Sequence, residues 1–413
     1  MQIPTSEELI RRIEALPSAA PVLAAVAGEP GVHLVGGAVR DLLLRAAGGD
    51  GPVAPAPGDL DLVAEGDVAA LASRLGGRYR AHERFGTASV ILDGHGYDFA
   101  MARRETYAAP GALPDVSPAT LTEDLRRRDF TVNAIAVTLG GPRAGELTAA
   151  PGALEDLAAG RLRVLHDRSF IDDPTRLLRL ARYASRLGFA IEPGTLALAE
   201  GAVAGDALTT VSGARIGAEL RLLAREEDPV AGLAAVAELG LDRAIDPRFG
   251  IADPELARRA FALLPGDGRR DVLALALAAA AISPAELAPL LDELAFDADS
   301  RDGIVAAVNG AERTAAALSA AERPSEIAAA VARGSAELVA LAGALGPVER
   351  AREWLESLRH VRLEIDGDDL IAAGVPEGPE VGQGLRAALA AKLDGRVGGQ
   401  ESELGEALRA VTA

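Results

Sequence analysis

The first 140 residues combine short apolar runs with glycine-rich breaks, which predicts a domain of mixed strands and helices. Residues 31–44, GVHLVGGAVRDLLL, are typical of a buried strand, a Gly-Gly turn and a helix. The segment DLDLV at residues 59–63 alternates polar and apolar positions, as a strand with one polar face does. Residues 88–92 and 96–102 are further strand candidates, and AAPGALPDVSPAT at 108–120 is expected to be a loop. We therefore expect an α/β or α+β domain.

Beyond about residue 150 the pattern predicts one helix after another, because apolar residues recur at spacings of three and four. The segment near residues 145–152 is the best candidate for a linker, and a weaker candidate lies near residue 230. We therefore expect three parts: a mixed domain at 1–148, a helical part at 149–230 and a second helical part at 231–413.

Composition narrows the class of protein. The chain has no cysteine, which excludes disulfides, thiolate zinc sites and a cysteine nucleophile. The N-terminal segment contains acidic residues and no uninterrupted apolar core, so a surface helix is expected rather than a signal peptide. Alanine-rich stretches such as residues 273–282 are too short to span a bilayer. We expect a cytoplasmic protein without a membrane partner.

The net charge of −19 argues against a generic nucleic-acid binder, because phosphate contacts need a positive surface. That objection is weakened by the position of the arginines, many of which fall between residues 126 and 186. Net charge is an average over the chain, whereas a substrate groove is local.

Three acidic residues are candidates for a metal site. Asp59 and Asp61 are two apart on a predicted strand, so their carboxylates point to one face and can converge on a cation. Asp98 lies on a later strand candidate that a sheet could bring alongside. Oxygen ligands of this kind suit Mg²⁺. Taken alone, the Asp-x-Asp pattern more often marks a solvated strand face.

A phosphate site could lie about twenty residues upstream. A Gly36-Gly37 turn before a helix leaves backbone N–H groups available at the helix start, and Arg40 could reach a phosphate oxygen. The simpler alternative is a tight turn followed by a surface arginine. A phosphate site and paired acids in one small domain make coincidence less probable.

Two arginine-rich segments follow. In TEDLRRRDFTVNAIAV, Arg128 and Asp129 precede an apolar run, which also fits a solvated helix start. In DDPTRLLRLARY, Asp172 or Asp173 could cap a helix beginning near Pro174. Arg176, Arg179 and Arg182 then recur every three residues along that helix. Capping acids and basic stripes are common structural features, but Asp173 and Arg176 also offer the acceptor and donor needed to read a base edge.

The ordered motifs VGGAVRDLLL, DLDLV, RRDFTVNAIAV and DDPTRLLRLARY resemble those of class II tRNA nucleotidyltransferases and bacterial poly(A) polymerases. The resemblance is strong through residues 31–190 and patchier beyond. It implies an α+β fold, in which a polymerase-like palm, the head, is followed by an all-helical neck, body and tail that hold the tRNA acceptor end.

The resemblance also implies roles for individual residues. Asp59 and Asp61 would bind Mg²⁺, with Asp98 as a third carboxylate. Gly36, Gly37 and Arg40 would hold the triphosphate, and Arg128 and Asp129 would contact the triphosphate and ribose. Asp173 and Arg176 would read the incoming base of CTP or ATP, supported by Arg179 and Arg182.

The chain departs from the family pattern before Leu154, where AAPGA stands in place of a common DPFGG segment. That difference concerns the hinge between head and neck. The only His-Asp pair, His166-Asp167, falls in the neck-like region, so no appended HD phosphohydrolase domain is expected.

The activity implied is addition of CMP and AMP to the tRNA 3′ end with release of pyrophosphate. The same motifs serve enzymes that add only CC, only the terminal A, or poly(A). A catalytically silent RNA-binding relative is an alternative of another class, although retention of Asp59, Asp61, Asp98 and Arg128 speaks against it.

Overall fold

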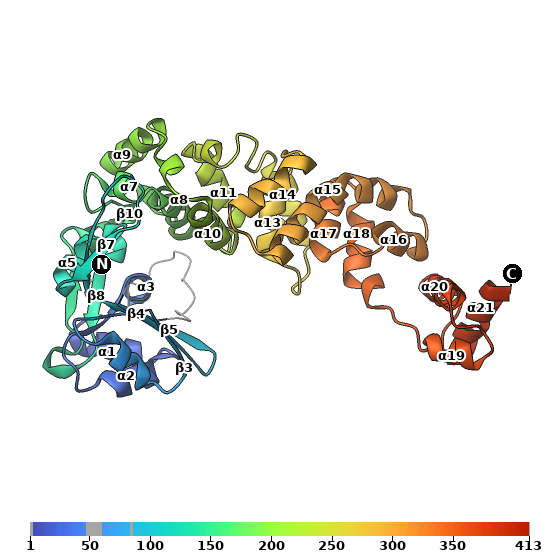
Figure 1. The fold of residues 1–413 in the computed structure, drawn as a ribbon, viewed down its shortest axis with the longest axis horizontal. Helices are drawn as coiled ribbons and strands as arrows, with labels where there is room; N and C mark the ends of the chain where they lie inside the picture. The colour runs from blue at the N-terminus through green and yellow to red at the C-terminus, as the bar shows by residue number, and fades with distance from the viewer. Residues whose placement is uncertain (1–2, 47–59, 83–85, 413) are drawn as a thin grey trace. The chain divides into compact units, whose positions relative to one another are not determined.

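The structure is a computed structural model that describes residues 3–46, 60–82 and 86–412. Its contacts divide the chain into two compact units (Figure 1). The first consists of Met1–Ser212 with Glu238–Ala244, and the second of Gly213–Ala237 with Ile245–Ala413. The three-part division expected from the sequence stays a prediction.

A seven-stranded sheet forms the framework of the first unit, within the described residues, in the order β3-β4-β5-β2-β1-β8-β9. Strands β2 and β5 run parallel, and their other neighbours are antiparallel. The strands span β1 Val32–Val35, β2 Leu60–Ala64, β3 Arg78–His82, β4 Thr87–Leu92, β5 His95–Met101, β8 Ile135–Thr138 and β9 Leu147–Ala149.

The expected strand, turn and helix at residues 31–44 are confirmed. All four residues of β1 are buried, as in a central strand covered on both faces. Helix α3, Gly37–Ala46, begins directly after the turn. Gly36 has a φ of +68°, which an L side chain rarely adopts, so glycine allows the chain to pass from strand to helix here. In β2, exposed Asp61 lies between buried Leu60 and Leu62, which confirms a strand with one polar face.

Helices and short strands complete the first unit. A two-stranded sheet pairs β6, Arg103–Thr106, with β7, Asp115–Pro118. The expected loop at 108–120 is therefore wrong over β7. Pro114 and Pro118 suggested a break, although an isolated hairpin edge tolerates proline.

Another small sheet pairs β10 Arg161–Leu162 with β11 Ala190–Ile191. The helices are α1 Ser6–Glu14, α2 Ala19–Val26, α3, α4 Val68–Ser73, α5 Leu121–Arg126, α6 Ala153–Ala159, α7 Ser169–Asp172, α8 Thr175–Leu187 and α9 Pro193–Ala204.

The second unit is helical in its described residues, which confirms the expected change of pattern. Its helices are α10 Gly213–Ala224, α11 Pro229–Glu238, α12 Pro254–Leu263, α13 Arg270–Ala278, α14 Pro284–Glu293, α15 Ala298–Ala320, α16 Pro324–Val331, α17 Ala336–Ala344, α18 Val348–Glu356, α19 Gly367–Ala372, α20 Pro379–Leu393 and α21 Gln400–Thr412. A mixed sheet followed by helices confirms the α+β class.

No single helix among the described residues is long and apolar enough to cross a membrane. One bent pair, α16 with α17, meets the length and composition requirements together, with an angle of 111° between its halves.

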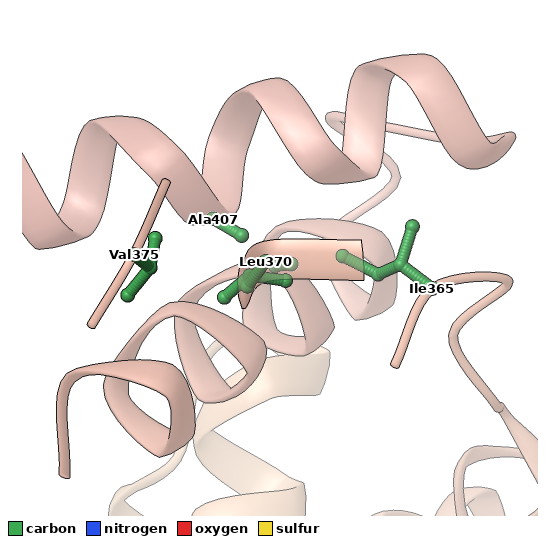
Figure 2. Packing of buried hydrophobic residues seen from close by; sticks show 5 residues of the cluster. Ile365, Leu370, Val375 and Ala407 are labelled. Carbon is green, nitrogen blue, oxygen red and sulfur yellow. The ribbon is translucent and has the colours of Figure 1, made fainter. Parts of the chain in front are cut away.

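The last three helices share a small apolar core (Figure 2). Leu370 of α19 is fully buried there, between Ile365 and Val375, and Ala407 of α21 packs against the same cluster. The neighbouring Ile371 is 42% exposed. Adjacent side chains on α19 thus differ sharply in burial, which allows a matched test of this core.

Leu370→Ala should destabilise the α19–α21 segment by about 3 kcal/mol, because it removes transfer energy and leaves a cavity. The measurement is hydrogen exchange of amides in α20 and α21, which reports local opening. Ile371→Ala is the control and should change the same free energy by less than about 0.5 kcal/mol. Equal losses in the two variants would contradict the assigned core.

Candidate active site

A cavity of about 300 Å³ lies in the first unit beside the sheet. It brings together residues from the β1–α3 turn, β2, the end of α5 and α8. The lining residues that the sequence had suggested are Gly36, Gly37, Asp61, Arg128, Asp129, Asp173, Arg176 and Arg179. The others are Arg103, Glu105, Arg127, Asn133 and Tyr183. Segments far apart in the chain therefore meet at one polar cavity.

Two of the three predicted metal ligands lie side by side. Asp61 and Asp98 are register partners on the parallel strands β2 and β5, and both are exposed. Neighbouring strands are about 5 Å apart, so the two carboxylates can share one cation. Ser89 donates a hydrogen bond from Oγ to Oδ1 of Asp98 at 2.6 Å, which fixes that carboxylate. Asp59 lies outside the described residues, among which no group of three potential metal ligands occurs.

The Gly-Gly turn faces Arg128. A Cβ placed on Gly36 would lie 3.2 Å from Nη1 of Arg128, so glycine lets the guanidinium approach the turn. Nη2 of Arg128 donates to Asp124 at 3.1 Å. Its Nε is buried and has no hydrogen-bond partner among the described residues. Because unsatisfied buried donors are rare, this one at the cavity edge suits an anionic ligand.

Arg40 lies behind the cavity rather than in its lining. Its side chain is 1% exposed, which excludes the alternative of a surface arginine. The triphosphate contact expected for Arg40 stays a prediction. Nε donates to Asp41 at 2.8 Å, and Nη1 donates to Oδ1 of Asn133 at 2.6 Å. Asn133 in turn donates from Nδ2 to Asp129 at 3.0 Å. In this structure Arg40 therefore supports Asp129 through Asn133.

Asp129 is a buried carboxylate held from two directions. Oδ1 accepts one hydrogen bond from Asn133 and another, at 2.7 Å, from the backbone N–H of Phe130. Oδ2 accepts from Nε and Nη2 of Arg179 at 2.9 and 2.5 Å. Burial opposes ionisation, but Arg179 and these hydrogen bonds hold the pKa of Asp129 well below its ordinary value. Asp129 therefore stays charged and binds α8 to the segment that follows α5.

Arg176 is fixed by groups from two other segments. Nη1 donates to Oγ of buried Ser169 at 2.8 Å, and Nη2 donates to the main-chain oxygen of Arg127 at 2.7 Å. Its Nε is 3.9 Å from Asp173. Asp173 accepts from the backbone N–H of Thr175 at 3.2 Å, so it serves the first turn of α8 as predicted. Asp172 instead pairs with Arg168. An arginine has five N–H donors, so donors remain for a ligand in the cavity.

Arg182 does not line the cavity. It is buried, with its guanidinium carbon 4.8 Å from the centre of the Tyr183 ring. Arg40 and Arg179 lie 5.4 and 5.7 Å from the same ring. Tyr183 also meets Phe130 edge to face at 5.9 Å. The tyrosine therefore spaces the arginines beneath the cavity, a role that the arginine periodicity did not reveal.

A second acid, Glu105 of β6, organises the opposite wall. Its Oε1 accepts from Arg127 at 2.8 Å and from Arg103 at 3.0 Å. Oε2 accepts from the hydroxyl of Tyr107 at 2.9 Å. Burial and the adjacent Glu105 raise the pKa of Tyr107 far above its ordinary value. Because the carbonyl of Arg127 also orients Arg176, Glu105 is one step removed from the arginine that the sequence predicts to read the base. The sequence signal was the segment ARRETY at residues 102–107, in which Glu105 was not singled out.

The altered hinge segment retains a structural glycine and a buried acid. Gly152 precedes α6 with a φ of +79°. Asp156 is buried and accepts from Thr131 at 2.9 Å and from Arg163 at 2.9 Å. These bonds connect α6 to the segment around Asp129 despite the AAPGA sequence.

Comparison with known proteins shows which proteins share this arrangement. Residues 32–163 match the family described as the poly A polymerase head domain, and these residues supply most of the cavity. A solved CCA-adding enzyme in an apo form shares the fold with a TM-score of 0.76 and 29% identity, over 99% of this chain and 100% of that one. This chain therefore resembles the class II tRNA nucleotidyltransferases and poly(A) polymerases. The predicted resemblance and the head followed by helices are thereby confirmed.

Relatives within the family carry different names. An A-adding tRNA nucleotidyltransferase of Halalkalibacterium halodurans is 43% identical over 221 residues, 52% of this chain and 50% of that protein. A CC-adding tRNA nucleotidyltransferase of Deinococcus radiodurans is 44% identical over 202 residues, 48% of this chain and 50% of that protein. The chain thus matches about half the length of these curated relatives.

The buried Asp129–Arg179 pair gives this protein a predictable acid response. A carboxylate whose pKa is lowered on folding stabilises the protein above its unfolded pKa, near 4, and this contribution is lost as pH falls toward the folded value. Arg179→Ala leaves the buried charge without its cationic partner. This variant should have a free energy of unfolding about 3 kcal/mol lower than that of the parent at neutral pH. As the pH falls below 4, the variant should lose less further stability than the parent does.

Urea unfolding between pH 7 and pH 3 would measure both effects. Arg168→Ala removes an arginine from an exposed ion pair with Asp172 and is the control, expected to change stability by less than about 1 kcal/mol. If the two variants lost equal stability at neutral pH, the buried pair would not be the constraint described.

Proposed function

We propose that the chain is a tRNA nucleotidyltransferase that transfers CMP and AMP from CTP and ATP to the tRNA 3′ end. The observation that carries this proposal is one cavity that joins Asp61 to the arginines of α8. Bond formation joins the RNA 3′ oxygen to the α-phosphorus, breaks the bond to the β-phosphate and releases pyrophosphate. The hydroxyl proton passes to solvent.

The carboxylates of β2 and β5 suit a divalent cation, because their oxygens are hard ligands and because Asp61 and Asp98 are register partners on neighbouring strands. We assign Asp59, Asp61 and Asp98 to a Mg²⁺ site, with the first two as principal ligands. Bound Mg²⁺ would activate the 3′-hydroxyl and neutralise charge on the phosphates. Ser89 orients Asp98 by its hydrogen bond, so this carboxylate is held before the cation binds.

The remaining side chains hold the nucleotide. The turn at Gly36 and Gly37, with Arg128, would contact the triphosphate, since backbone N–H groups and a guanidinium both suit phosphate oxygens. Asp129 would accept from a ribose hydroxyl. Asp173 and Arg176 would hydrogen-bond to the base edge, which selects C and A without a nucleic-acid template.

The helical parts would serve the RNA. We assign residues 1–148 to the catalytic head, 149–230 to the neck that carries the base-reading motif, and 231–413 to a body and tail that bind tRNA. Solved relatives include a Thermotoga maritima CCA-adding enzyme complexed with tRNA, with a TM-score of 0.73 and 26% identity over 99% of each chain. That complex supports assigning the acceptor end of tRNA as the partner.

Incorporation of labelled CTP and ATP into a tRNA lacking its CCA end tests the proposal. We expect both nucleotides to be added in order. CTP alone would identify a CC-adding enzyme, and ATP added only to a tRNA ending in CC would identify an A-adding enzyme. Asp61→Asn should lower incorporation by at least about a thousandfold, because it removes a charged ligand while keeping the side-chain shape. Incorporation of neither nucleotide by the parent protein would leave the silent RNA-binding relative as the better description.

Base selection by Arg176 can be tested separately. Arg176→Ala should reduce discrimination of CTP and ATP against UTP and GTP by roughly tenfold or more, the effect of losing a bidentate base contact. The measurement is kcat/KM for each nucleotide. Ser169→Ala is the companion variant, because it removes only one support of Arg176 and should give a smaller change in the same direction. Unchanged discrimination in Arg176→Ala would refute the base-reading role.

A further inference from the structure

A row of polar residues crosses four strands beside the candidate metal site. Asp61 of β2 pairs in register with Asp98 of β5, Asp98 pairs with Ser89 of β4, and Ser89 pairs with Arg80 of β3. Register partners point to the same face of a sheet. Arg80 therefore lies on the face of the candidate metal ligands, two strands or about 10 Å from Asp98.

A second arginine extends this row along the edge strand. Arg78 is two residues before Arg80 on β3, so it points to the same face, and it pairs in register with Ile91. Arg78 and Arg80 are exposed, and Ile91 is 57% exposed. We call Arg78, Arg80, Ser89 and Ile91 the β3–β4 strip. It combines two cations, a hydroxyl and an apolar side chain on one exposed surface.

The arginines of the strip differ from several other exposed arginines of the same unit. Arg74 pairs with Glu29, Arg104 pairs with Glu123, and Arg143 pairs with Glu146. Among the described residues, Arg78 and Arg80 form neither an ion pair nor a side-chain hydrogen bond. In a chain with a net charge of −19, two adjacent cations without acidic partners form a local site for a polyanion.

The in-line geometry of the proposed reaction indicates which part of the RNA lies on the β3–β4 strip. The lining of the cavity includes Asp61 of β2 but neither Asp98 of β5 nor any described residue of β3 or β4. In phosphoryl transfer the attacking and leaving oxygens lie roughly in line on opposite sides of the phosphorus. If the triphosphate occupies the cavity, the attacking 3′-hydroxyl comes from the β5 side, which is where the strip begins.

We infer that the single-stranded 3′ end of the acceptor RNA lies across the β3–β4 strip, with Arg80 and Arg78 contacting its phosphates. This inference rests on the proposed function, because it assigns the path of the RNA substrate. Ile91 would offer an apolar surface to a sugar or base. The strip sets the approach of the 3′ end, while the cavity selects the nucleotide.

The double variant Arg78→Ala/Arg80→Ala tests the strip, with Arg143→Ala as the control for loss of an exposed arginine elsewhere on the unit. The first readout is the Kd for a tRNA transcript ending in CC, measured by fluorescence anisotropy at several salt concentrations. We expect the double variant to bind this transcript about tenfold more weakly than the parent does. The slope of the logarithm of the association constant against the logarithm of the salt concentration should fall in magnitude by roughly 1.4, about 0.7 for each phosphate contact on a single strand. The control should match the parent.

A truncated transcript without the single-stranded 3′ nucleotides distinguishes contacts of the strip with the RNA 3′ end from a general attraction of the two arginines for RNA. It should bind the parent and the double variant equally. A tenfold loss with this transcript too would overturn the assignment to the 3′ end. An unchanged Kd and salt slope with the full transcript would overturn the strip itself. A midpoint of thermal unfolding equal to that of the parent would establish, for each variant, that the sheet edge is intact.

Steady-state kinetics provides the second readout. The double variant should raise KM for RNA by about tenfold and leave KM for CTP and ATP unchanged, because the nucleotide cavity is separate. A rise in nucleotide KM of the same size would contradict the assigned path. If the parent protein incorporated no nucleotide, the proposed function would fail, while the anisotropy comparison would still decide whether the strip binds an RNA 3′ end.

Discussion

The buried charge of Asp129 constrains the whole candidate active site. An ionised carboxylate inside a protein is tolerated only when charged and hydrogen-bonding partners surround it. Its partners here are Arg179 from α8 and Asn133 from the segment after α5, and Asn133 is itself held by Arg40 from α3. Three segments distant in sequence must therefore meet for this charge to be satisfied. The same requirement brings the Gly-Gly turn and α8 to one cavity.

Glu105 repeats this arrangement in the lining of the same cavity, where it accepts hydrogen bonds from Arg103 and Arg127. Each acid beneath the cavity fixes an arginine, so the guanidinium groups are oriented before the ligand binds. The lining contains one more arginine than acidic residues: Arg103, Arg127, Arg128, Arg176 and Arg179 against Asp61, Glu105, Asp129 and Asp173. Under the proposed function, attraction for a triphosphate would therefore depend on the orientation of donors and on the cation rather than on a large positive field.

Local sequence patterns predicted what depends on local chemistry. The alternation around Asp61 and the glycines at 36 and 37 determine a polar strand face and a turn, so both could be recognised in the sequence. The burial of Arg40 could not be recognised, because its position one turn into α3 fits a surface residue until Asn133 is placed against it. Glu105 and Tyr183 were missed for the same reason, since their partners lie on other segments. The strand β7 was missed because prolines in an isolated hairpin look like a loop.

The acidic surface has a further physical consequence for RNA recognition. A chain with net charge −19 repels polyanions over most of its surface, so an RNA gains affinity only where arginines lack acidic partners. Repulsion elsewhere penalises wrongly placed RNA more than it penalises RNA that follows the intended path. Because exposed arginines such as Arg74 and Arg104 are already paired with acids, they add little to nonspecific binding. Under the proposed function, the pairing of exposed arginines with acids would therefore limit where on the first unit an RNA end can lie.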